Sequence, residues 1–169
     1  MNAQDMIEAA RLTRVRELQT ALTKAAEENR LLRAENEMLA AHFDLAILAA
    51  GDLAALPLGG KLVIVDGWNM ILGSRKEARS RDDLLRQARE HVAANPLDFV
   101  WIVVDGPRAS SRAEGRVRVS YTGGRGAHRA DRLVCDFLKM ARLRGDVRRV
   151  EVRTNDKDFL KEVKRICAV

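Results

Sequence analysis

Cysteine is scarce in this sequence, which contains only Cys135 and Cys167 and has no CxxC motif or cluster of Cys and His. This pattern argues against a structural zinc site and for a reducing compartment. The N-terminal segment, MNAQDMIEAARLTR, has no apolar core of the kind that signal peptides carry. No apolar run approaches the length of a membrane span. We therefore expect a cytoplasmic protein without a membrane segment.

Aromatic residues are also scarce, at 4% of the chain, whereas hydrophobic residues together make up 47%. The core must therefore be mainly aliphatic, and few rings are present to stack on nucleic-acid bases. The formal net charge of +6 favours a polyanionic partner over an acidic protein surface. The alternative is an ordinary soluble protein rich in arginine, and charge alone does not separate the two.

The first fifty residues follow a heptad pattern that the rest of the chain lacks. The a positions are Val15, Leu22, Asn29, Asn36 and Phe43, and the d positions are Leu18, Ala25, Leu32, Leu39 and Ala46. Asparagine at a can pair across a parallel dimer and fix its register, and Glu28 at g faces Arg33 at e of the partner. We expect residues 1–50 to form a coiled-coil helix that pairs as a parallel homodimer through residues 15–46. The alternative is an amphipathic helix folded back on its own domain.

A different organisation begins after the segment GDLAALPLGG, residues 51–60, whose Gly and Pro predict a linker. Apolar strands are expected at 61–66, 99–105, 116–121 and 148–154, the third of them nearer an edge. Helices are expected to open at Ser80, near His128 and at Asp156; Ser80 and Asp83 resemble a capping box. This alternation predicts an α/β domain over residues 61–169, with a parallel sheet sandwiched by helices.

Aspartates follow the ends of the predicted strands. They are Asp66 in VIVDG, Asp105 in WIVVDG, Asp131 near the start of the helix after the third strand, and Asp156 in VRTND. In a parallel sheet these positions share the carboxyl edge, where open α/β sheets bind ligands. One such aspartate is usually a helix cap or a turn residue. Four at one edge repel one another unless a cation is bound, and Mg²⁺ or Mn²⁺ prefers oxygen ligands. We therefore expect all four to be metal ligands.

Four blocks of the sequence resemble the PIN-like nuclease fold, and in particular its NYN/YacP-like group. The blocks are VDGWNMI, WIVVDG, VRVSYTGGRGAHRADRLV and VRTNDKDF, and they occur in the family's order over about residues 62–169. The resemblance implies a metal-dependent endoribonuclease that hydrolyses RNA phosphodiester bonds by water attack, with Mg²⁺ or Mn²⁺ as its cofactor. It assigns catalytic roles to Asp66, Asn69, Asp131 and Asp156, and a secondary role to Asp105.

One residue departs from the family pattern. Arg132 stands where that family often carries a second acid after the one at Asp131. The loss implies either chemistry with a single metal or a catalytically weak or inactive RNA-binding module dimerised by its coiled coil. A phosphatase-like or nucleotide-binding domain is a third alternative, which the absence of GxGxxG and P-loop motifs disfavours.

The glycine-rich, basic segment TGGRGAHRAD, residues 122–131, is placed to contact RNA. We expect Arg125, His128, Arg129 and Arg132 to bind backbone phosphates, the alternative being an ordinary exposed loop. Trp68 is expected either to stack on a base or to pack against the edge of the sheet. The expected partner is RNA, single-stranded or structured, without sequence-specific readout.

Overall fold

The computed structural model describes residues 3–72, 78–124 and 128–168. It begins with one long helix, α1 (Ala3–Ala55), and continues as alternating strands and helices. The chain divides into two compact units, Met1–Glu37 and Met38–Val169, so that the division falls within α1. The prediction of a mixed α/β protein preceded by a long N-terminal helix is confirmed.

A five-stranded sheet lies at the centre of the second unit, in the order β3-β4-β2-β1-β5. The strands are β1 (Leu62–Asp66), β2 (Phe99–Val104), β3 (Ala109–Glu114), β4 (Val117–Thr122) and β5 (Val150–Arg153). All neighbouring pairs are parallel except β3 and β4, which are antiparallel. Every residue of β1 and β2 is buried, as expected for central strands with helices on both faces.

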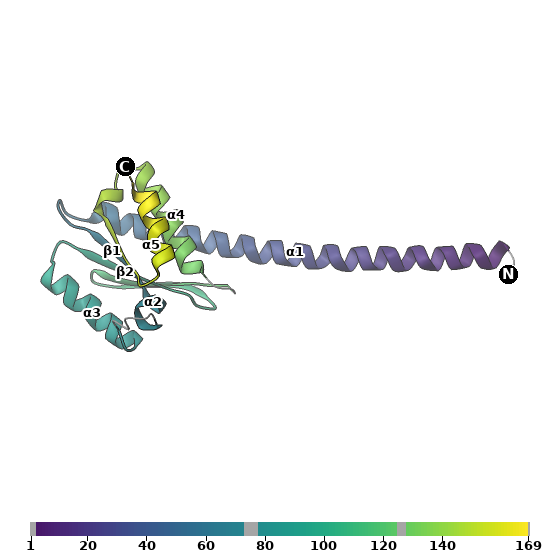
Figure 1. Ribbon diagram of the computed structural model, residues 1–169, viewed down its shortest axis with the longest axis horizontal. Coiled ribbons are helices and arrows are strands. Elements are labelled where there is room, and N and C mark those ends of the chain that lie inside the picture. The colour runs from purple at the N-terminus through teal and green to yellow at the C-terminus, as the bar shows by residue number, and fades with distance from the viewer. Residues whose placement is uncertain (1–2, 73–77, 125–127, 169) are drawn as a thin grey trace. The chain divides into compact units, whose positions relative to one another are not determined.

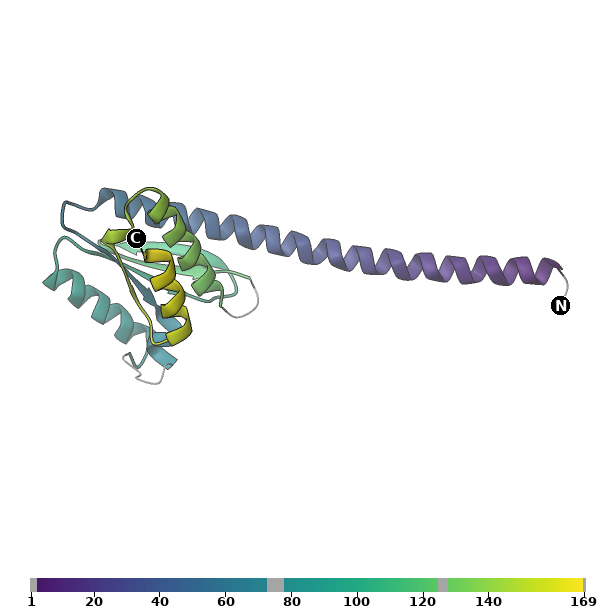
Figure 2. The ribbon, with the colours of Figure 1, turned by 45° about the horizontal axis from the view of Figure 1, so that its top comes forward.

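Helices cover the two faces of the sheet (Figures 1 and 2). One face carries α2 (Gly67–Leu72) and α3 (Arg81–Ala94); the other carries α4 (Arg129–Leu143), α5 (Lys157–Cys167) and the end of α1. Successive side chains of β1 alternate between these layers, as the pleat of a strand requires. Val63 and Val65 pack towards α2 and α3, whereas Leu62 and Ile64 pack towards α4 and α5.

The observed sheet differs from the predicted one by the outer strand β3. The sequence predicted a strand at 116–121 near an edge, but β4 is an inner strand, because β3 pairs with its outer side. The six residues of β3, ASSRAE, are polar and mostly exposed, so they lack the apolar pattern of a strand. The start of α3 is as predicted: Ser80 is the N-cap, and its Oγ accepts a hydrogen bond of 3.1 Å from the backbone N–H of Asp83.

The expected end of α1 is wrong, because the helix continues through Gly51 to Ala55. Leu45, Ala49 and Leu53 are at most 4% exposed and join the core that α4 and α5 form on the sheet. Burying a leucine side chain contributes about 1.5–3 kcal/mol, which outweighs the roughly 1 kcal/mol that a glycine costs inside a helix. Only residues 56–61 therefore connect α1 to β1.

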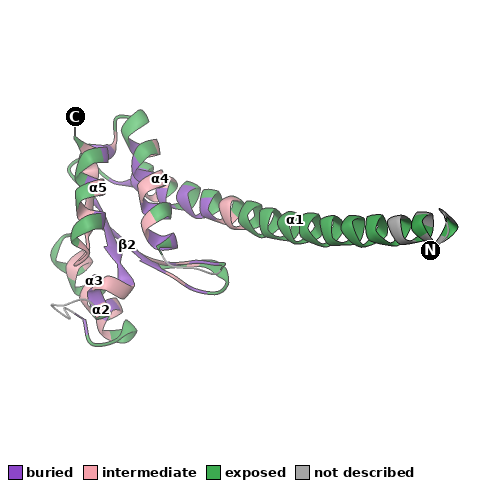
Figure 3. Cartoon of the chain, turned by 45° about the vertical axis from the view of Figure 1, so that its right-hand side comes forward, coloured by how far each residue is buried: buried purple, intermediate pink, exposed green. Residues whose placement is uncertain are grey.

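This packing also shortens the predicted coiled-coil seam. Ala46, a d residue, is 3% exposed and buried in the second unit, so the seam does not extend to residue 46. Further towards the N-terminus, the apolar seam residues Val15, Leu18, Leu22 and Leu32 are 49–71% exposed. Figure 3 shows the change along α1, from an exposed helix to one with a buried face. The alternative of a helix packed on its own domain therefore holds for the C-terminal part of α1, and the coiled coil stays a prediction for the exposed part.

One stretch of α1, within Arg11–Ala55, is long and apolar enough to cross a membrane by length and composition alone. It is the single stretch of this kind in the described part of the chain. The expectation that no apolar run approaches that length is therefore wrong. One face of the helix beyond Met38 is buried in the second unit, and core helices of soluble proteins pass the same test, so the stretch is weak evidence for a membrane segment.

Two glycines test the packing around the end of α1. A Cβ on Gly60 would lie 2.2 Å from the backbone oxygen of Leu97, whereas a Cβ on Gly51 would meet nothing within 4 Å. We expect Gly60→Ala to lower the free energy of unfolding by about 1–3 kcal/mol through overpacking. Gly51→Ala should raise it by about 0.5–1 kcal/mol, because alanine is the better helix former. Urea unfolding followed by circular dichroism measures both, and equal effects would contradict this packing.

Candidate active site

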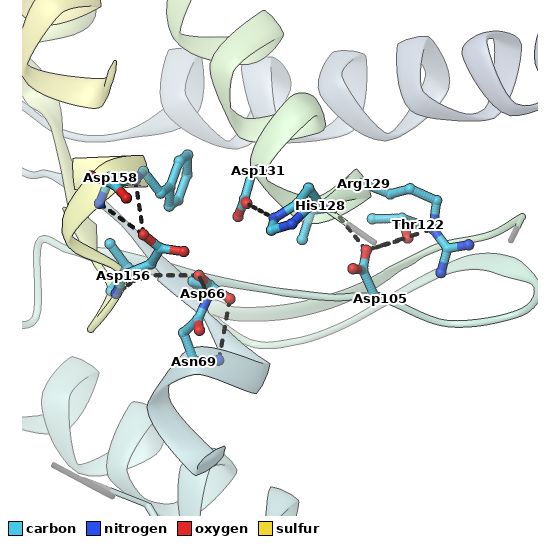
Figure 4. A network of polar contacts seen from close by, with 12 residues as sticks. Asp66, Asn69, Asp105, Thr122, His128, Arg129, Asp131, Asp156 and Asp158 are labelled. Atoms are coloured by element: carbon cyan, nitrogen blue, oxygen red, sulfur yellow. Dashed lines mark hydrogen bonds and ion pairs between the residues drawn. The ribbon is translucent and has the colours of Figure 1, made fainter. Parts of the chain in front are cut away.

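Three aspartates from three different elements surround a common space at the carboxyl edge of the sheet. Asp66 is the last residue of β1, Asp131 lies in the first turn of α4, and Asp156 is the N-cap of α5. Figure 4 shows Asp66 next to Asp156, with Asp131 across from them. Their charges affect one another, since Asp156 contributes to the pKa of Asp66, and both contribute to the pKa of Asp131. The structure thus brings these predicted residues together.

Asp66 is the most buried of the three, at 4% exposed. Its Oδ2 accepts hydrogen bonds from Asn69 Nδ2 at 2.5 Å and from Thr154 Oγ1 at 2.9 Å. Burial raises the pKa of Asp66, the hydrogen bonds from Asn69 and Thr154 oppose this, and the charge of Asp156 raises the pKa further. Asn69 therefore orients the carboxylate from α2.

Thr154 is a site residue that the sequence analysis missed. Its hydroxyl donates to Asp66 and accepts a hydrogen bond of 3.0 Å from the backbone N–H of Asp156. One side chain thus connects the end of β1 to the start of α5. Its place in the strand-end motif TND, two residues before the predicted acid, was the available signal.

Asp156 caps α5 while keeping part of its carboxylate available. Its Oδ1 accepts hydrogen bonds from the backbone N–H groups of Asp158 and Phe159, at 2.8 and 3.0 Å. This is ordinary N-cap geometry, which places a carboxylate at the positive end of a helix. Asp158 itself points to Lys161 on the exposed side of α5. Asp156, and not Asp158, therefore lies beside the other acids.

His128 contacts Asp131 immediately before α4. Its Nδ1 lies 3.0 Å from Asp131 Oδ2, and its backbone has a φ of 61°, a left-handed conformation that is unusual outside glycine. Hydrogen bonding to Asp131 and the charge of that carboxylate raise the pKa of the exposed His128. Burial raises the pKa of Asp131, the bond from His128 opposes this, and the charges of Asp66 and Asp156 add to the rise.

Asp105 has a different role from the one predicted for it. Its Oδ1 accepts hydrogen bonds from Thr122 Oγ1 at 3.1 Å and from the backbone N–H of Ala130 at 2.8 Å. His128, the N-cap residue of α4, makes no capping hydrogen bond with its side chain, so Asp105 supplies that acceptor from the end of β2. The same oxygen lies 3.7 Å from Arg129 Nε. Asp105 thus fixes the start of α4 and lies apart from the three other acids (Figure 4).

The basic residues expected to bind phosphates are placed differently from one another. Arg125 lies outside the described residues. Arg129 is buried, with 8% of its surface exposed, and its side chain points towards Asp105. The prediction that it binds phosphates at the surface is therefore wrong. His128 and Arg132 are exposed, and either can reach a ligand. Trp68 packs with the core under α3, and its Nε1 donates to the backbone oxygen of Asp105 at 2.9 Å.

The acids fit a hydrated cation better than a closed metal cage. In residues 3–72, 78–124 and 128–168, no group of three or more His, Cys, Asp or Glu side chains is arranged to hold a metal ion directly. Both capping hydrogen bonds of Asp156 go to its Oδ1, so Oδ2 lies outside the cap. Mg²⁺ keeps several water ligands and usually binds proteins through one or two carboxylates. The donor set therefore fits Mg²⁺ or Mn²⁺ bound partly through water.

The raised pKa of Asp131 predicts that its charge destabilises the metal-free fold. A carboxyl group whose pKa is higher in the folded than in the unfolded chain costs stability once it is ionised in both states. In EDTA at neutral pH, Asp131→Asn should raise the free energy of unfolding by about 0.5 kcal/mol, a small effect because water screens a half-buried group. Below about pH 3 the gain should vanish, because the carboxyl is then protonated in both states.

The control for this prediction is Asp158→Asn. The hydrogen bond from Lys161 lowers the pKa of Asp158, so the sign is reversed and the substitution should not stabilise the fold at neutral pH. Urea unfolding of both variants across this pH range measures the difference. A loss of stability for Asp131→Asn at neutral pH would show that its hydrogen bond with His128 outweighs the repulsion.

Comparisons with known proteins do not identify a family for this chain. Searches against protein-family models, curated proteins and solved structures each found no match.

Proposed function

We propose that the chain is a metal-dependent ribonuclease of the PIN-like fold and the NYN/YacP-like group, hydrolysing RNA phosphodiester bonds at the carboxyl edge of its sheet. The observation that carries the proposal is the group of three carboxylates, Asp66, Asp131 and Asp156, which three separate elements bring to one place. The net charge of +6 supports a polyanionic substrate. The sequence blocks described above support the choice of family.

In such a site, some side chains would bind the metal ion and others would position them. Asn69 and Thr154 hold the carboxylate of Asp66 in one orientation, and the N-terminus of α5 holds that of Asp156. Asp66, Asp131 and Asp156 would bind Mg²⁺ or Mn²⁺, directly or through water. The bound ion would lower the pKa of a water molecule and neutralise charge on the phosphate.

His128 supplies a positive charge next to the acids. The raised pKa of its imidazole keeps it protonated to a higher pH than an ordinary histidine. A protonated imidazole on the exposed side of Asp131 can donate a hydrogen bond to a phosphate oxygen. Arg132, one residue further along α4, adds a second exposed cation. These two residues, rather than the buried Arg129, are the proposed phosphate contacts.

A second candidate function is an RNA-binding module without turnover. Two observations favour it: Arg132 occupies the position of a family acid, and the described acids form no group that holds a metal directly. In that case the fold and the RNA partner are the same, but the carboxylates do not support hydrolysis. Cleavage and binding must therefore be measured separately.

We further propose that the protein is a cytoplasmic, parallel homodimer formed through the exposed seam of α1. The seam residues are exposed without interruption from Val15 to Asn36, about three heptads, and Phe43 further along is exposed as well. Asn29 and Asn36 at a favour a parallel partner of the same sequence, since they can pair across the seam. Exposed leucines such as Leu22, at 71%, gain burial from that pairing.

Cleavage of labelled single-stranded RNA tests the nuclease proposal. We expect the wild-type chain to cleave with Mn²⁺ or Mg²⁺ and to stop in EDTA. Asp66→Asn should lower the rate by roughly 100-fold or more, because it removes the best-oriented carboxylate. Thr154→Val, which removes a positioning hydrogen bond, should lower it by about 10- to 100-fold.

The matched control is Asp158→Asn, which changes an exposed acid of the same helix that pairs with Lys161. It should cleave at the rate of the wild type. Tight RNA binding with no cleavage in either metal would refute the nuclease proposal and support the binding module. Cleavage that continues undiminished in EDTA would remove the role of the metal.

Sedimentation equilibrium at micromolar concentration tests the dimer. We expect the mass of two chains for the wild type and of one chain for Leu22→Glu, because a charge at an a position opposes burial of the seam. Thr20→Glu places the same charge at the outward f position and should stay dimeric. A monomeric wild type, or dimers of both variants, would contradict the proposed seam.

A further inference from the structure

Arg81 lies over two aromatic rings at the same end of the sheet as the acids. Its guanidinium carbon is 5.0 Å from the centroid of the Trp68 ring and 5.4 Å from that of Tyr121. Its Nη1 also donates a hydrogen bond of 3.4 Å to the Tyr121 hydroxyl. These contacts restrict a side chain that is otherwise flexible and hold its guanidinium group in place.

Three elements build this cluster, which we call the Arg81 cluster (Trp68, Arg81 and Tyr121). Trp68 lies on α2, two residues after Asp66, and is anchored by its hydrogen bond to the Asp105 backbone. Tyr121 lies near the end of β4, and its ring packs so closely on Gly106 that a Cβ there would be 2.9 Å away. Both rings are half-buried, whereas Arg81 is exposed at the first position of α3.

Arg81 differs from its neighbours on α3 in its charged contacts within the described residues. On the same helix, Arg86 forms ion pairs with Asp83 and Glu90, and Arg89 pairs with Glu114. Among the residues that the structure describes, Arg81 forms no ion pair. An exposed guanidinium that aromatic rings hold, and that no carboxylate in the described part of the chain covers, can offer its outer face to a ligand.

A cavity of about 260 Å³ adjoins the cluster and shares Tyr121 with it. Its other lining includes Leu85 of α3 and Val117 and Val119 of β4, with Arg89 and Ser110 among the polar groups. Largely apolar walls with a few polar groups are typical of small-molecule sites. The space beside the Tyr121 ring is therefore not filled by the protein itself.

We propose that the Arg81 cluster is a stacking site for an unpaired nucleobase of single-stranded RNA. Guanidinium planes and aromatic rings stack on the faces of splayed bases, and every base has such a face. A base within a duplex has no free face, so the site selects single strands without reading their sequence. This inference rests on the proposed RNA substrate and specifies it as single-stranded. Trp68 follows Asp66 by two residues in the chain, so a base stacked on the Arg81 cluster would lie near the acids.

Binding of three oligonucleotides of equal length tests the site: single-stranded RNA, the same strand without bases, and duplex RNA. Asp66→Asn protein in EDTA prevents cleavage during the measurement. The single strand should bind about tenfold more tightly than the abasic strand, the size expected for stacking of one base. Arg81→Lys keeps the charge but loses the planar group, and should bring the two affinities close together. Arg86→Lys, a matched change on the same helix at a residue outside the cavity lining, should preserve the difference.

Tryptophan fluorescence gives a second readout. Trp101 is fully buried and donates to Ser120 Oγ, so Trp68 is the tryptophan that a stacked base would quench. The quenching should disappear in Trp68→Phe, which keeps a ring and therefore keeps most of the binding. Thermal unfolding confirms that both variants are folded.

The outcomes separate this inference from the proposed function. Equal affinity for the normal and abasic strands, or full base dependence in Arg81→Lys, would overturn the stacking site. If the wild type still cleaves RNA with Mn²⁺ in that case, the nuclease proposal stands alone. Base-dependent binding without any cleavage would leave the stacking site and remove the nuclease.

Discussion

The carboxylate of Asp66 is buried at the end of a strand that helices cover on both faces. An ionised group there needs hydrogen-bond donors, because burial disfavours its charge. Asn69 and Thr154 provide them, so the start of α2 and the segment before α5 are tied to β1. Through Thr154 the same carboxylate is linked to the backbone of Asp156. The positions of two of the three acids thus depend on the way one buried charge is satisfied.

The two Asp-Gly strand ends look alike but serve different purposes. Asp66 belongs to the acidic group, whereas Asp105 accepts the hydrogen bond that caps α4 and holds Arg129 in the interior. The cap that Asp105 provides also positions the acidic group, because α4 carries Asp131. A structural acid at the end of β2 therefore helps to set the place of a catalytic candidate on another element. Replacing Asp105 would be expected to displace Asp131 rather than to remove a ligand.

Apolar strands and helix caps were predictable because their signals are local. The runs before Asp66 and Asp105 and the cap at Ser80 could be located from residue type and spacing alone. Strand β3 was missed because its residues are polar and lack the apolar pattern of a strand, and α2 was missed because it has six residues and follows β1 directly. For the site, the sequence predicted which acids follow the ends of strands. The direction of each carboxylate, the burial of Arg129 and the part played by Thr154 depend on contacts between distant segments, which spacing does not reveal.

The polar outer strand that escaped prediction has a consequence for self-association. A sheet edge exposes unpaired backbone groups that can recruit a strand from another molecule. Here one edge is β3, whose exposed residues include the charged Arg112 and Glu114, and the other is β5, only four residues long and carrying Glu151 and Arg153. Short edge strands and charged side chains both discourage such pairing. The features that hide β3 from pattern recognition are therefore also those that protect the domain from aggregating edge to edge.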